Sequence, residues 1–350
     1  MSTFKKFSII ISASEQDQDD SLPDNVRCVL HSFFLLIEED AKLALEDEDF
    51  QKLSDSALKR ATEFLESKRW ADIKNNYRLQ FQNDCTFEPE TFDSIICLLA
   101  YTESQQHKAN PVFQETHIQF FREYVDIMSC VRKTRQLFQD VKFAYLGCLL
   151  PILANCLSKL EFVKQDLVCC NPLLDAIVNG IRQRFETQLE NMNYKVAAGF
   201  HPTFRLKWTS KYSLDPTWTK DIEVEMCKLL RETMEKSKEE NFACQSPTNE
   251  FLAEITTSTE RETTLISSEA ETLIRHWLAG ESTPVKDNCF LGSTHLSSLF
   301  RKYNTAFPSG APIMKKIKHA DVMKLKANSL ATTDFENMLF IQMNKDLLSL

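Results

Sequence analysis

Apolar residues recur at the spacing of an α-helix along much of this chain, and few residues interrupt that spacing. The clearest stripes are Val26, Leu30, Phe33, Phe34, Ile37 and Ala41; Ile118, Phe121, Tyr124, Val125 and Met128; Leu146, Leu149, Leu150, Leu153, Leu157 and Leu160; and Leu173, Ile177, Ile181 and Phe185. Such a period places each stripe on one face of a helix. Only 6 glycines and 11 prolines occur in 350 residues, so few positions break a helix. We therefore expect a mainly α fold.

The bulk properties restrict the class of protein. A chain of 350 residues can bury one large core or two, and its 43% hydrophobic and 26% charged residues are ordinary for a soluble globular protein. The net charge of −9 gives no overall basic footprint for DNA binding. The 11 cysteines are scattered and odd in number, and no signal peptide precedes them, so we expect reduced thiols in a nuclear or cytoplasmic, not secreted, protein. No apolar run reaches about 18 residues, so no membrane span is expected.

Several short segments carry a family resemblance. They read RCVLHSFFL at 27–35, FFREYV at 120–125, YLGCLLP at 145–151, HPTFRLKW at 201–208 and LFRKYNTAFPSGAPIMKK at 299–316. Together they resemble segments of hAT-family DNA transposases, most specifically in the last of them and in YLGCLLP with HPTFRLKW. The resemblance implies an α-helical insertion domain together with remnants of a ribonuclease-H-like α/β core, with short strands near residues 6–12.

The same comparison suggests how the chain is organised. Residues 1–25 are expected to be a truncated start and an acidic linker, 26–234 a helical transposase-like region, 235–266 a polar linker, and 267–350 a region like the family's C-terminal dimerisation region. A capping box of Thr333 and Glu336 predicts a final helix in that last region.

The family's catalytic acids are not found at their matching positions. Met314 stands where the family has its metal-binding Glu, and a thioether does not hold Mg²⁺, which prefers hard oxygen ligands. Residues 2–7 resemble the segment that follows the family's second catalytic Asp, so both Asp residues and an N-terminal zinc finger are expected to be absent. Phe87 and Glu88 also replace an Arg-Trp pair of the family. The resemblance therefore implies a protein without catalytic residues, with an active transposase as the remote alternative.

The C-terminal region offers apolar residues for a protein interface. By analogy with the family's dimers, the candidates for dimerisation are Leu296, Leu299, Phe300, Phe335, Met338, Leu339, Ile341 and Met343. The expected partner is a second copy of the chain or a related transposase-like chain. The open alternative is that these residues close the chain's own core.

A basic cluster before the predicted last helix offers a second function. Lysines can neutralise phosphates or form a nuclear localisation patch, and the alternative is a solvated surface strip. The candidate nucleic-acid contacts are His31, Lys315, Lys316, Lys318, Lys324 and Lys326. Residual DNA binding is thus the alternative to a purely interacting module.

No metal site, cofactor or small-molecule substrate is expected from the sequence. Cys28 and His31 could supply half of a zinc site, but a closed site needs four ligands, so a core cysteine and a histidine at its edge are favoured. The adjacent Cys169 and Cys170 are expected to serve in packing. No GxSxG, Walker A or GxGxxG motif occurs.

Overall fold

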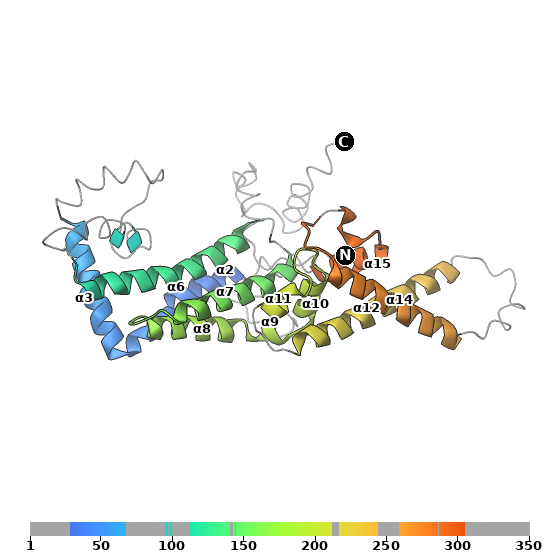
Figure 1. The fold of residues 1–350 in the computed structure, drawn as a ribbon, viewed down its shortest axis with the longest axis horizontal. Helices are drawn as coiled ribbons and strands as arrows, with labels where there is room; N and C mark the ends of the chain where they lie inside the picture. Colours follow the sequence, from blue (N-terminus) through green and yellow to red (C-terminus); the bar gives the residue numbers. More distant parts are fainter. Residues whose placement is uncertain are drawn as a thin grey trace, which may run out of the picture. The chain divides into compact units, whose positions relative to one another are not determined.

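The computed structural model of the protein describes residues 29–67, 95–96, 98–99, 113–140, 143, 145–211, 217–243, 259–285 and 287–304. These residues are mainly helical, and no strand occurs among them (Figure 1). The α-helices are α2 (Val29–Glu38), α3 (Glu48–Leu65), α6 (Glu115–Gln139), α7 (Leu149–Lys164), α8 (Asn171–Arg184), α9 (Glu186–Glu190), α10 (Met192–Phe200), α11 (Lys207–Lys211), α12 (Trp218–Ala243), α14 (Thr259–Ala279) and α15 (Thr294–Asn304). The 3-10 helices are η1 (Asp40–Glu46), η3 (Leu146–Cys148) and η4 (Asp287–Phe290). The predicted mainly α fold is confirmed, whereas the strands expected near 6–12 lie outside the described residues.

The described residues divide into two compact units. Unit 1 is drawn from Met1–Leu30, Gln136–Asn155 and Thr187–Leu350, and unit 2 from His31–Arg135 and Cys156–Glu186. Residues 235–243, which we expected to begin a polar linker, continue helix α12, and α14 begins at Thr259. Lys and Glu have good helix propensity, so a polar composition did not by itself indicate a linker here.

Phenylalanines form much of the core of unit 2. Phe64 and Phe121 each pack against Phe113 with ring centroids 5.7 and 5.8 Å apart, and Phe50 packs against Phe120 at 5.8 Å. Burying a phenylalanine stabilises a fold by about 1.5–3 kcal/mol, and a well-placed ring pair adds ~0.5–1.5 kcal/mol. This cluster therefore holds α3 against the start of α6.

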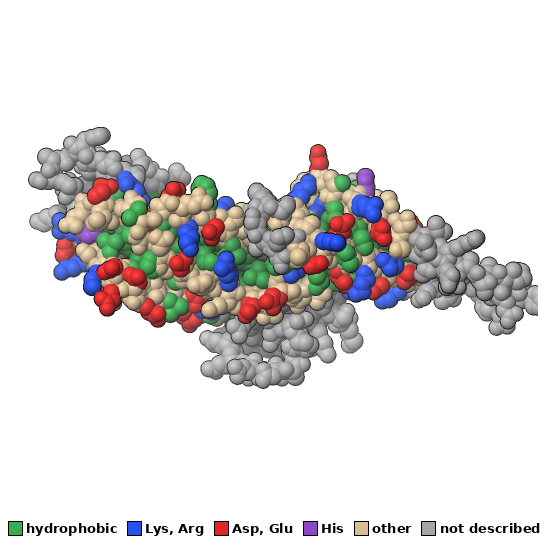
Figure 2. All heavy atoms as spheres, turned by 60° about the horizontal axis from the view of Figure 1, so that its bottom comes forward, with side chains coloured by type: hydrophobic (Ala, Val, Ile, Leu, Met, Phe, Trp, Pro, Cys, Tyr) green, Lys and Arg blue, Asp and Glu red, His purple; other side chains and the backbone are tan. Residues whose placement is uncertain are grey.

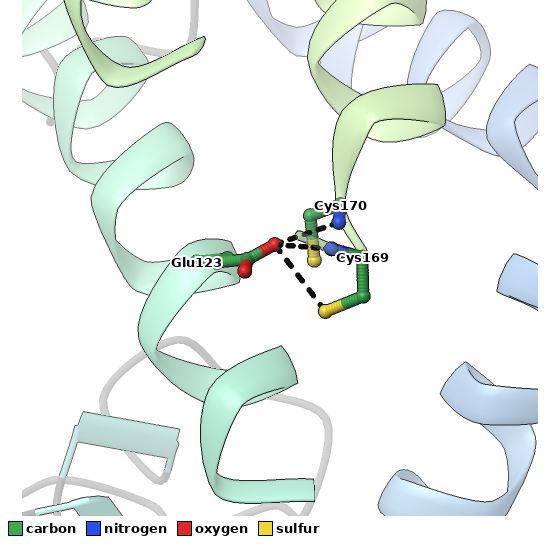
Figure 3. Close-up of side chains that lie close together, drawn as sticks. All are labelled: Glu123, Cys169 and Cys170. Atoms are coloured by element: carbon green, nitrogen blue, oxygen red, sulfur yellow. Dashed lines mark hydrogen bonds between the residues drawn. The ribbon is translucent and has the colours of Figure 1, made fainter. Parts of the chain in front are cut away.

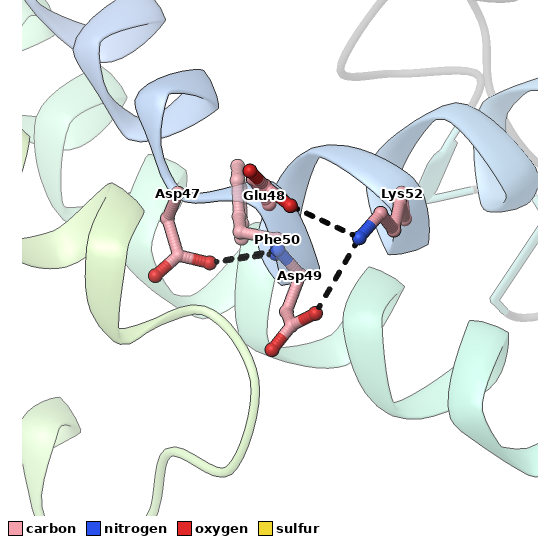
Figure 4. A network of polar contacts seen from close by, with 5 residues as sticks. All are labelled: Asp47, Glu48, Asp49, Phe50 and Lys52. Atoms are coloured by element: carbon pink, nitrogen blue, oxygen red, sulfur yellow. Dashed lines mark hydrogen bonds and ion pairs between the residues drawn. The ribbon is translucent and has the colours of Figure 1, made fainter.

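Helix α3 of unit 2 begins at a capping aspartate (Figure 4). Asp47 Oδ1 accepts hydrogen bonds from the backbone N–H groups of Asp49 (3.1 Å) and Phe50 (2.9 Å). A cap of this kind stabilises a helix by about 1 kcal/mol. One turn on, Lys52 Nζ lies 3.3 Å from Glu48 Oε2, an exposed pair that adds ~0.3–0.5 kcal/mol. The cap thus sets where α3 starts, and the ion pair contributes less.

Helix α8 packs closely on η1 in unit 2. Gly180 permits this approach, since a Cβ there would lie 2.5 Å from Asp40 Oδ2. The Asp40 carboxylate is held by Arg184, whose Nη2 donates to Asp40 Oδ1 at 2.8 Å and to Glu39 Oε2 at 2.8 Å, while its Nε donates to Asp40 Oδ2. A small residue and a forked ion pair therefore join α8 to η1.

Helix α10 lies at the centre of unit 1 and packs against α12 and α15. Its last turn is bonded to α14, because Trp277 Nε1 donates to the carbonyl oxygen of Gly199 at 2.9 Å. Gly199 leaves room for Met226, since a Cβ at this position would lie 2.5 Å from the Met226 sulfur. Helices α12 and α14 run side by side over much of their length (Figure 1). Helices α12, α14 and α15 thus all contact α10.

One helical stretch among the described residues, Leu146–Lys164, is long and apolar enough by composition to cross a membrane. Of its most apolar 18 residues, 61% are buried inside the protein, and the core helix of a soluble protein has the same composition.

Candidate functional site

The structure buries the part of the predicted dimerisation set that it describes. Leu296, Leu299 and Phe300 lie on α15 with 0%, 2% and 7% of their surfaces exposed within a single chain. For these three residues, the structure shows the alternative, a contribution to the chain's own core. The other five, Phe335, Met338, Leu339, Ile341 and Met343, lie outside the described residues.

The predicted nucleic-acid contacts fall almost entirely outside the described residues. This holds for Lys315, Lys316, Lys318, Lys324 and Lys326, and for Met314 beside them. Helix α2 includes the backbone of His31, but its side chain is not among the described ones. On the face drawn in Figure 2, basic and acidic side chains of the described residues are interspersed.

Three of the motif segments meet in the core of unit 1, around His201. Its ring centroid lies 5.4 Å from that of Tyr145, 5.8 Å from that of Phe300 and 5.1 Å from that of Phe204. Tyr145 belongs to YLGCLLP, Phe300 to the C-terminal motif (LFRKYNTAFPSGAPIMKK, residues 299–316), and Phe204, like His201, to HPTFRLKW. These segments lie far apart in the sequence. Sequence reasoning had not placed the segments next to one another.

The imidazole of His201 is positioned by two polar contacts. The backbone N–H of Thr203 donates to Nδ1 at 3.3 Å, so the ring proton sits on Nε2, which lies 3.5 Å from the Cys148 sulfur. Burial lowers the pKa of His201 to about 4 and raises the pKa of the Cys148 thiol to about 12. A nucleophilic Cys–His pair needs the opposite shifts, because the reactive form is a thiolate. This pair is therefore suited to packing.

The side-chain amide of Asn304 joins the same segments. Its Oδ1 accepts from the backbone N–H of Gly147 at 2.8 Å, and its Nδ2 donates to the carbonyl oxygen of Ala197 at 3.0 Å. Asn304 ends α15, Gly147 lies in η3 and Ala197 lies in α10. One buried amide thus satisfies a donor and an acceptor that would otherwise be unpaired in the interior.

Unit 2 holds the one group of potential metal ligands found among the described residues. Atoms of Glu123, Cys169 and Cys170 that could serve as ligands all lie within 4.8 Å of one another (Figure 3). Glu123 projects from α6, and the two cysteines lie just before α8, with Cys170 as its N-cap residue. The sequence offered two partial signals, the Glu of FFREYV and the paired cysteines, but 46 residues separate Glu123 from Cys169.

The Glu123 carboxylate is fully engaged in hydrogen bonds. Oε1 accepts from Gln119 Nε2 (2.7 Å) and from the N–H of Val168 (2.8 Å). Oε2 accepts from the N–H groups of Cys169 (2.9 Å) and Cys170 (2.7 Å) and from the Cys169 thiol (3.3 Å). In this way a buried acid forms a cap in front of α8: it accepts from the N–H groups of the three residues that precede the helix, close to the helix N-terminus, where a negative charge is favourable.

These contacts set the protonation states of the cluster. Burial works to raise the pKa of Glu123, but the hydrogen bonds from Gln119 and the backbone of Cys169, Cys170 and Val168 outweigh it and lower the pKa. Burial and then Glu123 raise the pKa of the Cys169 thiol to about 12. Burial, followed by Cys169 and Glu123, also raises the pKa of Cys170. At neutral pH the cluster therefore holds one carboxylate and two thiols.

A polar recess of about 470 Å³ in unit 2 contains a serine beside a histidine. Ser56 Oγ lies 3.1 Å from His117 Nε2. A catalytic triad needs a third group that orients the histidine. Within the described part of the chain, however, His117 Nδ1 is buried without a hydrogen-bond partner. The pair thus lacks the orienting acid in this part of the structure.

An apolar cavity of about 260 Å³ lies in unit 1. Its lining residues include Pro151, Ile152, Phe204 and Trp208, with Thr203 and Lys207 as polar groups. Apart from Ile152, which directly follows YLGCLLP, these residues come from the same two segments, YLGCLLP and HPTFRLKW, that meet around His201.

No protein-family model matches this sequence, and no curated protein and no solved structure is significantly similar to it.

Proposed function

We propose that this chain is a transposase-derived protein of the hAT type that acts as a protein-interaction module and not as an enzyme. The observation that supports the proposal is the packing of YLGCLLP, HPTFRLKW and the C-terminal motif around His201 and Asn304. Segments that share a family resemblance and also share a core fit a single inherited scaffold. The proposal includes a remnant of a ribonuclease-H-like core and a nuclear location.

We propose that the chain is not an enzyme because Met314 stands where the family has its metal-binding Glu. Two-metal phosphoryl transfer needs several carboxylates that converge on the ions, and a thioether at the Glu position supplies no hard oxygen ligand. A nicking or strand-transfer assay with Mg²⁺ or Mn²⁺ tests this directly. Robust DNA cleavage by the purified chain would contradict it.

The interaction surface we propose is narrower than the one expected at first. Leu296, Leu299 and Phe300 are already buried in unit 1, so they are not available to a partner without opening this core. The proposed contact residues are therefore Phe335, Met338, Leu339, Ile341 and Met343, and the partner is a second copy of the chain. Each side chain buried in such an interface contributes on the order of 1.5–3 kcal/mol.

Light scattering at micromolar concentration tests the dimer. We expect the wild-type mass to be that of two chains and the double variant Phe335→Asp, Leu339→Asp to give the mass of one. Val224→Asp is a matched control, because Val224 is exposed on α12, away from the proposed surface in sequence. A wild-type protein that stays monomeric, or a double variant that stays dimeric, rules out this interface.

A second candidate function, nucleic-acid binding, rests on the lysine cluster at 315–326. It stands out in a chain of net charge −9. Affinity should fall steeply as salt rises, because each neutralised phosphate releases counterions. The variant Lys315→Glu, Lys316→Glu should weaken binding and reduce the salt dependence, whereas Lys52→Glu on α3 should change little. Equal DNA retention by all three proteins would exclude the cluster as a contact.

A further inference from the structure

We propose that Glu123, Cys169 and Cys170 form a binding site for a thiophilic divalent cation of the Zn²⁺ or Cd²⁺ class. The site is independent of the proposed interaction function. It is assembled from α6 and from the segment before α8, and its ligand atoms lie within 4.8 Å of one another (Figure 3). Glu123 and Cys170 are buried, and Cys169 is partly exposed, so an ion has a side from which to enter.

The ligand set fits this class of cation. Zn²⁺ binds cysteine sulfur at about 2.3 Å and carboxylate oxygen at ~2.0–2.2 Å, in tetrahedral sites that also accept water. In such geometry a sulfur and an oxygen ligand lie about 3.6 Å apart. The Cys169 sulfur lies 3.3 Å from Glu123 Oε2, close to this value. Three protein ligands and one water on the Cys169 side complete four-coordination.

The charge balance favours exchange of the cation for the two thiol protons over addition of the cation to the protonated cluster. The step is M²⁺ + 2 RSH → M(SR)₂ + 2 H⁺, in which two S–H bonds break and two metal–sulfur bonds form. Before the step, the cluster carries one negative charge on Glu123; afterwards, one carboxylate, two thiolates and the cation carry the same total. Because the net charge does not change, the buried site gains no uncompensated charge.

The helix cap survives this exchange. The cation takes the place of the Cys169 thiol proton on Oε2, so the S–H···O bond to Glu123 is given up, as is the long bond from the Cys170 thiol to the carbonyl oxygen of Phe120 (3.7 Å). The backbone bonds from Val168, Cys169 and Cys170 and the bond from Gln119 remain. The N-terminus of α8, a helix of 14 residues, favours the thiolates that form.

Proton release gives a distinctive pH dependence. An ordinary cysteine thiol has a pKa of about 8.5, so both thiols are protonated at neutral pH before the cation binds. Metal binding must displace two protons, so affinity should rise about 100-fold per pH unit over the neutral range. A carboxylate-only surface site would show almost no such dependence there.

The experiment uses reduced, metal-free full-length protein. Cd²⁺ is titrated while the ultraviolet thiolate-to-cadmium charge-transfer band is recorded, and Zn²⁺ affinity is measured by competition with a chromogenic chelator at several pH values. The double variant Cys169→Ser, Cys170→Ser should lose one bound equivalent. Cys130→Ser is the matched control, since Cys130 is a partly exposed cysteine on α6 in the same unit. It should keep that equivalent.

A further variant separates a metal site from a helix cap alone. Glu123→Gln keeps an oxygen that can accept backbone hydrogen bonds, but it removes the carboxylate ligand. We expect folded protein by circular dichroism with at least tenfold weaker Zn²⁺ binding. The proposal fails if the wild type and the double cysteine variant bind the same number of equivalents, or if affinity is independent of pH. Either result assigns the cluster to capping α8 only.

Discussion

Asn304 Oδ1 accepts a hydrogen bond of 2.8 Å from the backbone N–H of Gly147, across 157 positions of the sequence. The same amide donates to Ala197, so a single side chain ties α15 to η3 and α10. The contact brings YLGCLLP and the C-terminal motif together, and both are central to the resemblance described above.

Replacing Asn304 should therefore be costly. Asn304→Leu keeps the branched shape of the side chain but leaves the Gly147 N–H and the Ala197 carbonyl buried without partners. Each such loss costs about 1–3 kcal/mol, so we expect the free energy of unfolding to fall by ~2–6 kcal/mol in urea denaturation. Asn304→Ser has a shorter side chain that can replace one of the two hydrogen bonds at most, so its free energy of unfolding should lie between those of the wild type and Asn304→Leu. An Asn304→Leu protein as stable as the wild type would show that these bonds contribute nothing.

Gly147 should tolerate no larger side chain. A Cβ there would lie 2.3 Å from the Ala197 carbonyl oxygen and 2.5 Å from Asn304 Oδ1, and the first of these belongs to backbone that cannot rotate away. Gly147→Ala should lower the free energy of unfolding by about 1–3 kcal/mol. Gly292→Ala is the contrasting control: nothing lies within 4 Å of its Cβ position, and only its φ of 71° costs about 1 kcal/mol. A larger loss in Gly292→Ala than in Gly147→Ala would contradict this packing.

His201 should make stability depend on pH. Burial lowers its pKa to about 4, below the 6.5 of an unfolded chain, so between these values the unfolded state binds the proton more readily. The free energy of unfolding should hence be highest above pH ~6.5 and fall by about 3 kcal/mol as pH drops towards 4. Urea unfolding of wild type and His201→Asn from pH 7 to 4.5 isolates this effect, since other titrating groups are common to both. Parallel curves would exclude it.

Arg184 and Asp40 offer a test of geometry at constant charge. The fork of Arg184 reaches both Asp40 oxygens and Glu39, and the hydrogen bond with Asp40 is the main cause that raises the pKa of the guanidinium. Lysine cannot reproduce the fork, so Arg184→Lys should cost about 1–2 kcal/mol in urea unfolding. Arg60→Lys, at a half-exposed pair with Glu63 (3.1 Å), should cost less than about 0.5 kcal/mol. Equal effects would mean that the fork adds nothing.

The helices were largely predictable from the sequence, but their buried faces only in part: Phe34, assigned to the apolar stripe of α2, is 50% exposed. Leu173, Ile177, Ile181 and Phe185 were assigned to one face and are all buried. The prediction for α6 was less accurate: Phe120 and Ile127 were not assigned to its apolar stripe but are buried, whereas Val125 was assigned to it and is only partly buried. A helix that packs on several sides buries more than one stripe, and spacing alone does not show which neighbours cover it.

Neither polar cluster could be predicted from spacing. Glu123 lies among apolar residues on α6, and nothing nearby in the sequence shows that the backbone of Val168, Cys169 and Cys170 satisfies it. His201 could likewise be read only as part of a motif. Its burial against Tyr145 and Phe300 follows from packing between distant segments.

The sequence by itself determined that the described part of this chain is mainly helical and where its apolar stripes lie, because helix formation depends on neighbours three or four positions apart. Tertiary structure alone decided which buried polar groups meet: Asn304 with Gly147, and Glu123 with the start of α8. Such pairings satisfy hydrogen bonds between segments far apart in the chain. They therefore exist only once the helices have packed.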